Sequence, residues 1–190
     1  MNFSETKLEG AYLIEPERKE DERGFFTRTW CQREFGEQNL ETQLVQCNLS
    51  FNHKAGTVRG MHYQLPPFAE TKLVRCTQGA IFDVVIDLRP ASATFLQWIG
   101  MELTQANRLM LYVPQGFAHG FQTLADNSEV FYQMSEFYAP EYACGLRWDD
   151  PAFDILWPQA VSVIAARDQQ YTNCKPNEFH LFSDNIVAQQ

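Results

Sequence analysis

Short apolar runs bounded by turn residues dominate the middle of the chain. Residues 81–88 read Ile-Phe-Asp-Val-Val-Ile-Asp-Leu and stop at an Arg-Pro pair. Runs of about four to eight β-branched and aromatic residues, separated by Gly, Pro, Asn and Asp, are typical of strands in an antiparallel sandwich or barrel. The pattern therefore predicts strands at 72–76, 81–88, 108–113, 120–124 and 129–135.

Helical periodicity is confined to two segments. We expect helix only near Thr29–Asn39 and around Val161–Tyr171. Prolines are scattered at turns, and no repeat, low-complexity tract or flexible linker divides the chain. The sequence therefore predicts a single, mainly β domain over residues 1–190, with a few short helices and a peripheral tail at about 170–190.

Composition narrows the class of protein without identifying a function. The 190 residues are 45% hydrophobic and 21% charged, which is typical of a soluble globular domain. The net charge of −9 disfavours a nucleic-acid partner, because proteins that bind DNA usually carry a basic face. Five cysteines without a C-x-x-C pair, no apolar leader and no run of 18 apolar residues predict a cytoplasmic protein with reduced thiols and no membrane partner.

Two of the four histidines lie in patterns that carry chemical information. Pro114–His119 has the P-x-G-x-x-H spacing of the second cupin motif. Metal cupins carry H-x-H in the first motif, but here Gln64 follows His62 where the second histidine would stand. One histidine without a firm carboxylate partner is a poor transition-metal site. We therefore expect a cupin barrel without a bound metal, whose pocket histidines do other work.

An ordered set of further motifs resembles the dTDP-4-dehydrorhamnose 3,5-epimerase family from about Asp21 to Asp168. The resemblance implies a cupin-type jelly-roll sandwich or barrel and a homodimer that shares active-site residues across subunits. It also implies a nucleotide-diphosphate ketosugar substrate, no cofactor, and proton transfer at the carbons that flank a C4 ketone. The motifs are D-E-R-G-F-F at 21–26, G-T-V-R-G-M-H-Y-Q at 56–64, T-K-L-V-R-C at 71–76, G-A-I-F-D-V-V-I-D-L-R at 79–89, P-Q-G-F-A-H-G-F at 114–121, Y-A-P at 138–140, G-L-R-W-D-D-P at 145–151 and L-W-P at 156–158.

Epimerisation beside a ketone needs a base, a charge that holds the enolate oxygen, and an acid on the opposite face. Through the resemblance, His62 is expected to be the base, because an imidazole titrates near neutral pH. Lys72 matches the lysine that stabilises the enolate, and Tyr132 matches the general acid. Taken alone, each residue also has a purely structural interpretation: His62 as a core histidine, Lys72 as a solvated strand-end lysine and Tyr132 as a packed tyrosine.

Two aspartates are expected to support these groups. Asp168 resembles the family aspartate that pairs with the base histidine, although Arg167 precedes it where a lysine is usual. Such a carboxylate would fix the imidazole tautomer and raise its basicity. Asp83 lies in an otherwise apolar strand, and a buried carboxylate needs partners, so we expect it to support the histidine site.

Substrate binding is expected from residues outside this catalytic set, and two departures from the family pattern leave its details open. Arg28 stands where the first segment usually carries a glutamate, and Ala143 stands where many members carry Glu. A carboxylate and a guanidinium offer opposite hydrogen-bonding groups, so the identity of the nucleotide is not fixed. The expected binding residues are Arg23, Phe26, Gln46, Asn48, Arg59, His119 and Tyr138.

Several functions stay open on these residues. The first is cofactor-independent epimerisation at both C3 and C5 of an NDP-4-keto-6-deoxyhexose. A related enzyme that inverts only C3 or only C5, or that acts on a GDP-, CDP- or UDP-linked sugar, would keep the same base and lysine. A cupin that only binds a nucleotide sugar would not need an acid and a base on opposite faces. A metal-dependent cupin dioxygenase is the remaining alternative.

Overall fold

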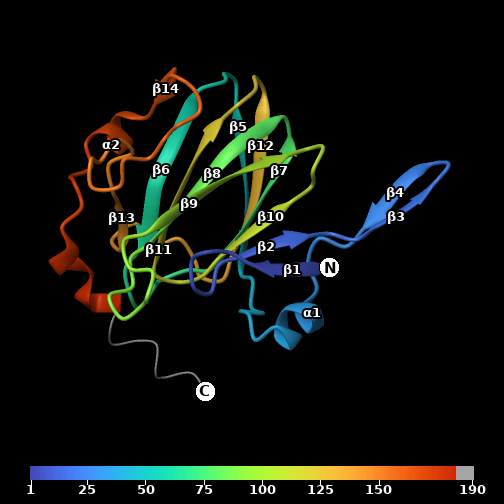
Figure 1. Cartoon of the computed structure of the whole chain (residues 1–190), viewed down its shortest axis with the longest axis horizontal. Coiled ribbons are helices and arrows are strands. Elements are labelled where there is room, and N and C mark those ends of the chain that lie inside the picture. Colours follow the sequence, from blue (N-terminus) through green and yellow to red (C-terminus); the bar gives the residue numbers. More distant parts are fainter. Residues whose placement is uncertain (183–190) are drawn as a thin grey trace.

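Two antiparallel β-sheets face each other and enclose the interior of the protein (Figure 1). The computed structural model describes residues 1–182. The first sheet has the strand order β1 (Asn2–Glu5), β2 (Tyr12–Glu15), β10 (Met110–Val113), β7 (Lys72–Gln78), β12 (Ser128–Met134) and β5 (Gln46–Asn52). The second has the order β13 (Ala143–Gly145), β6 (Thr57–Gln64), β11 (Phe117–Thr123), β8 (Ala80–Asp87) and β9 (Trp98–Thr104), with β14 (Val163–Ile164) parallel to β6. The predicted fold class, a mainly β jelly roll with a few short helices, is confirmed.

The apolar core lies between the sheets and follows the period-two alternation of the strands. Val74 and Cys76 of β7 and Val130 of β12 face Ile81 and Val85 of β8 across the interior. All five are at most 2% exposed. Lys72 on β7 and Tyr132 on β12 continue these inward rows and line a cavity, so the interior changes from a packed core to a lined cavity.

The helices are shorter than the sequence pattern predicts. Near 29–39, only α1 (Gln32–Glu37) forms, and Asn39 ends this segment in the left-handed region with φ of 56°. Around 161–171, only α2 (Ala166–Gln169) is helical. The β-branched residues before it form β14 instead, because Val163 and Ile164 pair with β6.

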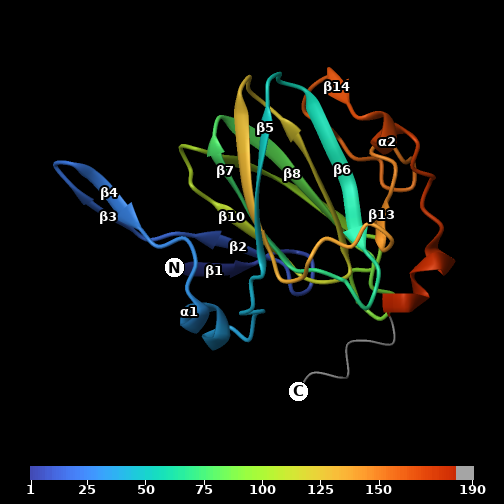
Figure 2. The ribbon, with the colours of Figure 1, turned by 180° about the vertical axis from the view of Figure 1, so that it is seen from behind.

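Part of the predicted peripheral tail belongs to the core. The 3₁₀-helix η1 (Pro176–Phe182) buries Phe179 and Phe182 to 2% and 4% exposure. Both rings pack near Tyr63 of β6, with centroids 6.2 and 6.0 Å away. Residues 176–182 therefore pack on the outer face of the second sheet. Figure 2 shows this segment in red near β13.

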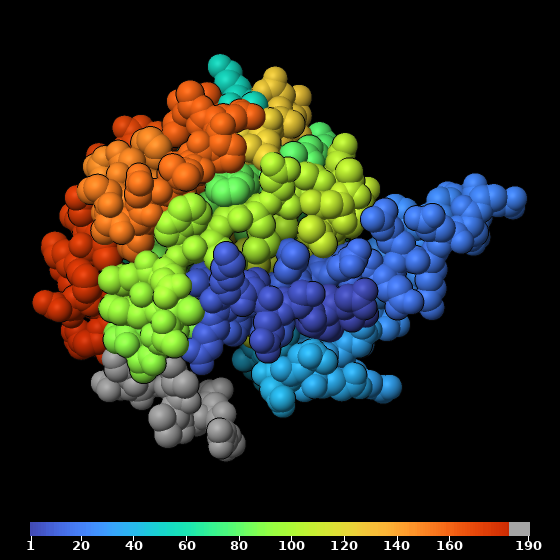
Figure 3. Space-filling view, in the orientation of Figure 1, coloured from blue at the N-terminus to red at the C-terminus, as the bar shows by residue number. Residues whose placement is uncertain are grey.

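A third, two-stranded sheet leaves the body of the molecule. The strands β3 (Arg18–Asp21) and β4 (Gly24–Thr27) form a hairpin that projects into solvent (Figures 1 and 3). Seven of its eight strand residues are exposed, among them Phe25 and Phe26. An isolated two-stranded hairpin is only marginally stable in water, so this one lacks the cover that such a structure needs.

Within residues 1–182, no helix is long and apolar enough to cross a lipid bilayer.

Candidate active site

A cavity with two lobes occupies the polar end of the space between the sheets. The lobes measure about 370 and 350 Å³, and three side chains, those of His62, Lys72 and Tyr132, line both. His62 comes from the second sheet, whereas Lys72 and Tyr132 come from the first. The first lobe is also lined by Gln46, Asn48, Tyr63, Gln64, Glu70, Met134, Tyr138, Ala143, Cys144 and Arg167, and the second by Leu49, Ser50, Phe51, Arg59, His119, Gly120 and Phe121.

An irregularity in β6 turns two of these side chains toward the same cavity. Arg59 and His62 have opposite parity, so a regular strand would point them to opposite faces. Opposite β6, His119 pairs with His62 and Phe121 pairs with Arg59, so β6 has one residue more than β11 over this stretch. The backbones meet closely here, because a Cβ on Gly60 would lie 2.5 Å from the Cα of Gly120. The bulge therefore needs glycine on both strands.

His62 is held from behind by Asp168. Its Nε2 lies 2.8 Å from Oδ1 of Asp168, and the backbone N–H of Gly60 donates to Oδ2 at 3.2 Å. Pairing of β14 with β6 delivers this carboxylate, because α2 begins two residues after Ile164. Asp168 is 4% exposed, whereas 41% of the His62 side chain is exposed. The imidazole thus has one anchored nitrogen and one edge toward the cavity.

The protonation state of Asp168 fixes the tautomer of His62. Burial alone raises the pKa of this carboxyl, but the hydrogen bond and charge of His62, with the Gly60 N–H, outweigh burial and lower the pKa below its ordinary value. An ionised carboxylate only accepts hydrogen bonds. Nε2 of His62 therefore carries the hydrogen, which leaves the lone pair on Nδ1.

The ring of Tyr171 forms a wall beside this histidine. The two ring centroids are 6.0 Å apart with an interplanar angle of 71°. Gly145 makes room for the tyrosine, because a Cβ there would lie 2.3 Å from the ring. The hydroxyl of Tyr171 is buried and has no hydrogen-bond partner within residues 1–182.

Lys72 is a buried cation at the start of β7. It is 7% exposed, and its Nζ lies 2.8 Å from Oε1 of Glu70 and donates to the carbonyl oxygen of His62 at 3.3 Å. The lysine is therefore not the solvated strand-end residue that its position in the sequence allowed. Its ammonium belongs to the cavity wall.

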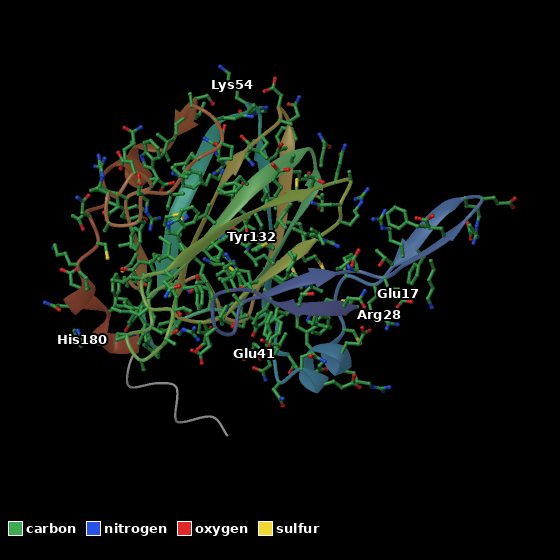
Figure 4. All side chains as sticks on the ribbon, in the orientation of Figure 1. Glu17, Arg28, Glu41, Lys54, Tyr132 and His180 are labelled. Carbon is green, nitrogen blue, oxygen red and sulfur yellow. The ribbon has the colours of Figure 1, made fainter. Side chains whose placement is uncertain are left out.

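Tyr132 faces the cavity from β12 of the first sheet. It pairs with Val74 of β7 and Asn48 of β5, and it shares its inward face with the buried Val130 and Met134. Figure 4 labels Tyr132 in the body of the molecule. Asn48 and the neighbouring inward residue Gln46 hydrogen bond to each other at 3.0 Å. These polar side chains form one wall, opposite the wall that His62 and His119 form.

A second histidine–carboxylate pair lies deeper in the same interior. Nε2 of His119 is 2.8 Å from Oδ1 of Asp83, and both residues are buried. The structure does not bring Asp83 to His62, because β11 lies between β8 and β6 in the sheet. Asp83 thus supports His119. Its Oδ2 is buried and has no partner among the described residues.

Gln64, at the position of the second histidine of metal cupins, is a structural brace. Its Nε2 donates to the carbonyl oxygens of Phe68 and Phe137 at 2.8 and 3.2 Å, and its Oε1 accepts from the N–H of Ala139 at 2.7 Å. Its amide is therefore occupied by three backbone groups. Over residues 1–182, no three His, Cys, Asp or Glu side chains are grouped as metal ligands.

Two arginines contribute positive charge to the lobes. Arg59 in the second lobe donates from Nε to Oδ1 of Asn52 at 2.7 Å. Arg167 in the first lobe donates from Nη1 to the hydroxyl of Tyr138 at 3.3 Å. Tyr138 is 49% exposed, so this pair lies at the rim of the cavity.

Arg23 and Phe26 lie away from this cavity. Both belong to the projecting hairpin, where the Arg23 guanidinium pairs with Asp21 and Phe26 is 68% exposed. Arg28, at the base of the hairpin in Figure 4, pairs at 2.7 Å with Glu34, which also binds the N-terminal amine. In this arrangement Arg28 anchors the hairpin to α1.

Sequence reasoning missed Glu70, Arg167, Tyr171 and the bracing role of Gln64. Glu70 precedes Lys72 by two residues, and a carboxylate beside a lysine that enters an apolar run was the available signal. Tyr171 belongs to no motif recognised in the sequence, and only the fold brings its ring close to that of His62.

Comparison with known proteins gives consistent matches along most of the chain. A family model described as dTDP-4-dehydrorhamnose 3,5-epimerase matches residues 5–175. A protein of that name from Sinorhizobium fredii is 43% identical over 164 residues, which cover 86% of this chain and 84% of the relative. A dTDP-4-dehydrorhamnose 3-epimerase from Streptomyces niveus is 36% identical over 163 residues, covering 85% of this chain and 78% of the relative.

A solved structure agrees with the fold. The crystal structure of dTDP-4-dehydrorhamnose 3,5-epimerase from Bacillus anthracis, with TDP and PPi bound, superimposes with a TM-score of 0.88 at 39% identity. The match covers 91% of this chain and 99% of that chain. The similarity therefore extends over both sheets and the cavity between them.

Proposed function

This chain belongs to the dTDP-4-dehydrorhamnose 3,5-epimerase family and is therefore an isomerase, and from that premise we propose that it epimerises a dTDP-4-keto-6-deoxyhexose at C3, C5 or both. The proposed substrate is of the dTDP-4-keto-6-deoxyglucose type, and the product is of the dTDP-4-keto-rhamnose type. Catalysis uses proton transfer through an enolate, with a histidine base and a tyrosine acid.

One observation carries this mechanism. The three side chains shared by both lobes supply a base, a cation and an acid, and the base and the acid come from opposite sheets. A ketosugar held between the sheets would present one face to His62 and the other to Tyr132. Inversion at carbon requires this arrangement, because the proton must leave from one face and return to the other.

His62 starts the reaction. Its Nδ1 lone pair takes a proton from the carbon next to the C4 ketone, and the electron pair of that C–H bond moves into the carbonyl to form an enolate. Asp168, 2.8 Å from Nε2, stabilises the imidazolium that results. An N–H bond forms on His62 as the C–H bond of the sugar breaks, and the negative charge moves to the C4 oxygen.

Lys72 meets that oxygen charge. Two of the three ammonium donors are directed to Glu70 and to the His62 carbonyl, which leaves one for an oxygen in the cavity. A fixed charge aimed at a developing oxyanion stabilises the transition state more than the ketone. Tyr132 then gives its phenolic proton to the carbon from the opposite face.

After one inversion, His62 has gained a proton and Tyr132 has lost one. Exchange with water restores both groups, so the proton that enters the sugar derives from solvent. Each inverted carbon is therefore expected to take up one deuterium in heavy water.

The nucleotide would extend away from these three residues. Arg59 offers a guanidinium to the diphosphate oxygens, and Tyr138 offers an aromatic ring to the nucleobase. Gln46, Asn48 and His119 add amide and imidazole groups along the two lobes. No cofactor takes part in the proposed reaction, and a cytoplasmic location stays a prediction of the sequence.

We propose further that the working unit is a homodimer in which the hairpin of one subunit reaches the cavity of its partner. The support is that Arg23 and Phe26, both implied ligands, are exposed on a hairpin that projects from its own body. The exposed Leu49 and Phe51 line the second lobe and offer an apolar rim to such a hairpin.

Hybrid dimers test this sharing of residues. His62→Ala and Arg23→Ala would each be nearly inactive alone, whereas a co-expressed mixture forms dimers with one intact site. The mixture is expected to recover about one quarter of wild-type activity, since half the dimers are hybrids with one of two sites intact. No recovery would show that each subunit uses its own hairpin or none.

Proton NMR in deuterated water tests the function itself. With dTDP-4-keto-6-deoxyglucose and no added metal, deuterium is expected at C3, C5 or both, and its position separates a double epimerase from a single one. Exchange only with GDP-, CDP- or UDP-linked ketosugars would change the nucleotide. Tight binding of the dTDP sugar without any exchange would favour a binding protein and contradict the proposal.

A further inference from the structure

The buried pair formed by Glu70 and Lys72 closes a circuit of contacts around the base. The N–H of Gln64 donates to Oε2 of Glu70 at 3.1 Å, and Oε1 of Glu70 lies 2.8 Å from Nζ of Lys72. Nζ in turn donates to the carbonyl oxygen of His62 at 3.3 Å. His62 and Gln64 lie two residues apart on β6, so the circuit ties the ammonium to the strand that carries the base.

Both members of the pair are almost fully enclosed. The side chains of Glu70 and Lys72 are 4% and 9% exposed, and both line the first lobe. A flexible lysine side chain has four methylene groups, and its free rotation would otherwise spread the ammonium over several ångströms. The carboxylate restricts it to one position, which is the junction of the two lobes.

The other carboxylates near the cavity are engaged elsewhere. Asp168 is paired with His62 and Asp83 with His119, so within residues 1–182 Glu70 is the ion-pair partner of Lys72. Removing one member of a buried pair leaves the other without compensation. Lys72 therefore depends on Glu70 both for its place and for its counter-charge.

We propose that Glu70 is a positioning residue of this enzyme, which holds the Lys72 ammonium at the point where the enolate oxygen develops. The inference rests on the proposed function and adds a residue to it. Glu70 transfers no proton in this account. Its contribution is the geometry of Lys72, and a small misplacement of a group that stabilises an oxyanion has a large effect on rate.

A double-mutant cycle tests whether Glu70 acts through Lys72. Glu70→Gln keeps the shape of the side chain but removes its charge, and it is expected to lower kcat for deuterium exchange by about 10- to 100-fold with KM changed less than about threefold. In a Lys72→Met background, the same change is expected to lower the remaining rate by less than about twofold. An equal loss in both backgrounds would overturn the proposal, because Glu70 would then act independently of Lys72.

A matched control separates positioning from general damage to the fold. Glu129→Gln removes a carboxylate from β12 that accepts a hydrogen bond from Thr77 at 2.7 Å and lines neither lobe. It is expected to keep wild-type kcat. Glu70→Asp, which retains the charge on a shorter side chain, is expected to regain part of the activity lost in Glu70→Gln. A variant with Asp no better than Gln would contradict a role for the charge.

A labelling experiment decides the link between the two residues without any substrate. Acetic anhydride modifies free amines, and mass spectrometry of peptides gives the rate at Lys72. In Glu70→Gln this rate is expected to rise at least about fivefold, because the amine is no longer held in its ion pair with the carboxylate and moves more freely toward the reagent. Equal rates would overturn the proposal. A wild-type protein that exchanges no ketosugar would refute the proposed function, while the labelling rates would still report whether Glu70 governs Lys72.

Discussion

The interior contains two histidine–carboxylate pairs with the same 2.8 Å contact and different surroundings. The side chain of His62 is 41% exposed, whereas that of His119 is 9% exposed. The carboxylate of Asp168 comes from α2, beyond the second sheet, and takes an additional N–H from Gly60. Asp83 comes from β8, directly beside the strand of His119.

The two histidines therefore have the same kind of partner but differ in their access to the cavity. His62 has a fully satisfied carboxylate behind it and an accessible edge in front, which suits a group that gains and loses a proton. His119 is enclosed, and its partner has one oxygen, Oδ2, without a donor among the described residues. In the proposed mechanism, the same pair of residue types therefore transfers protons at His62 and shapes the pocket at His119.

The largest expected difference follows from removing each imidazole. His62→Asn is expected to lower kcat by at least about 10³-fold, because a general base is lost. His119→Asn is expected to act mainly on KM, by about tenfold, because a binding contact is lost. Steady-state kinetics with the dTDP-linked ketosugar checks both values. Similar losses of kcat in the two variants would remove the distinction between the pairs.

The partner carboxylates are expected to follow the same order. Asp168→Asn removes the charge that stabilises the imidazolium, so we expect kcat to fall by about 10²-fold or more. Asp83→Asn is expected to lower kcat by less than about tenfold. The measurement is kcat at saturating substrate, with circular dichroism as a control for folding. A larger loss in Asp83→Asn would place the reactive pair at His119.

Acid stability sharpens the account of Asp168. Its pKa is lower in the folded protein than in the unfolded chain, so its contribution is present above the ordinary carboxyl pKa and is lost as pH falls through the folded pKa. Asp168→Asn should therefore be less stable than wild type by about 1–3 kcal/mol near pH 7. Urea unfolding at a series of pH values is expected to show this gap closing below about pH 4. A gap that is constant or grows toward acid would contradict the shift.

The smallest effect is expected at the wall beside His62. Tyr171→Phe keeps the ring that packs on Gly145 and removes a buried hydroxyl without a partner in the described chain. We expect kcat within about twofold of wild type. The free energy of unfolding is expected to stay within about 0.5 kcal/mol of wild type or to rise slightly. Thermal unfolding and kinetics measure both. A large loss of activity would indicate that the hydroxyl contacts substrate.

The strands and the inward rows were within reach of the sequence. Alternation predicts that Tyr132 shares a face with Val130 and Met134, and the structure confirms that arrangement. The strands predicted at 72–76 and 81–88 correspond to β7 and β8. Local patterns of this kind suffice to predict the strands, because every second side chain of a strand points to the same face and the buried face is therefore apolar.

Contacts between strands that are distant in the sequence could not be predicted from it. The order of β6, β11 and β8 decides that Asp83 meets His119 and not His62, and no local pattern encodes that order. The parity shift that turns both Arg59 and His62 inward depends on a bulge shared by two strands. Asp168 was placed beside His62 only through a resemblance, because 106 residues separate the two along the chain.

The central claim, a base and an acid on opposite faces of the ketosugar, is tested most directly by deuterium uptake in two variants. In heavy water, His62→Ala is expected to leave C3 and C5 of the substrate free of deuterium. Tyr132→Phe is expected to retain some uptake while completion of the inversion is impaired, since the base still removes the proton. Equal and complete loss of uptake and inversion in Tyr132→Phe would contradict the assignment of these two roles.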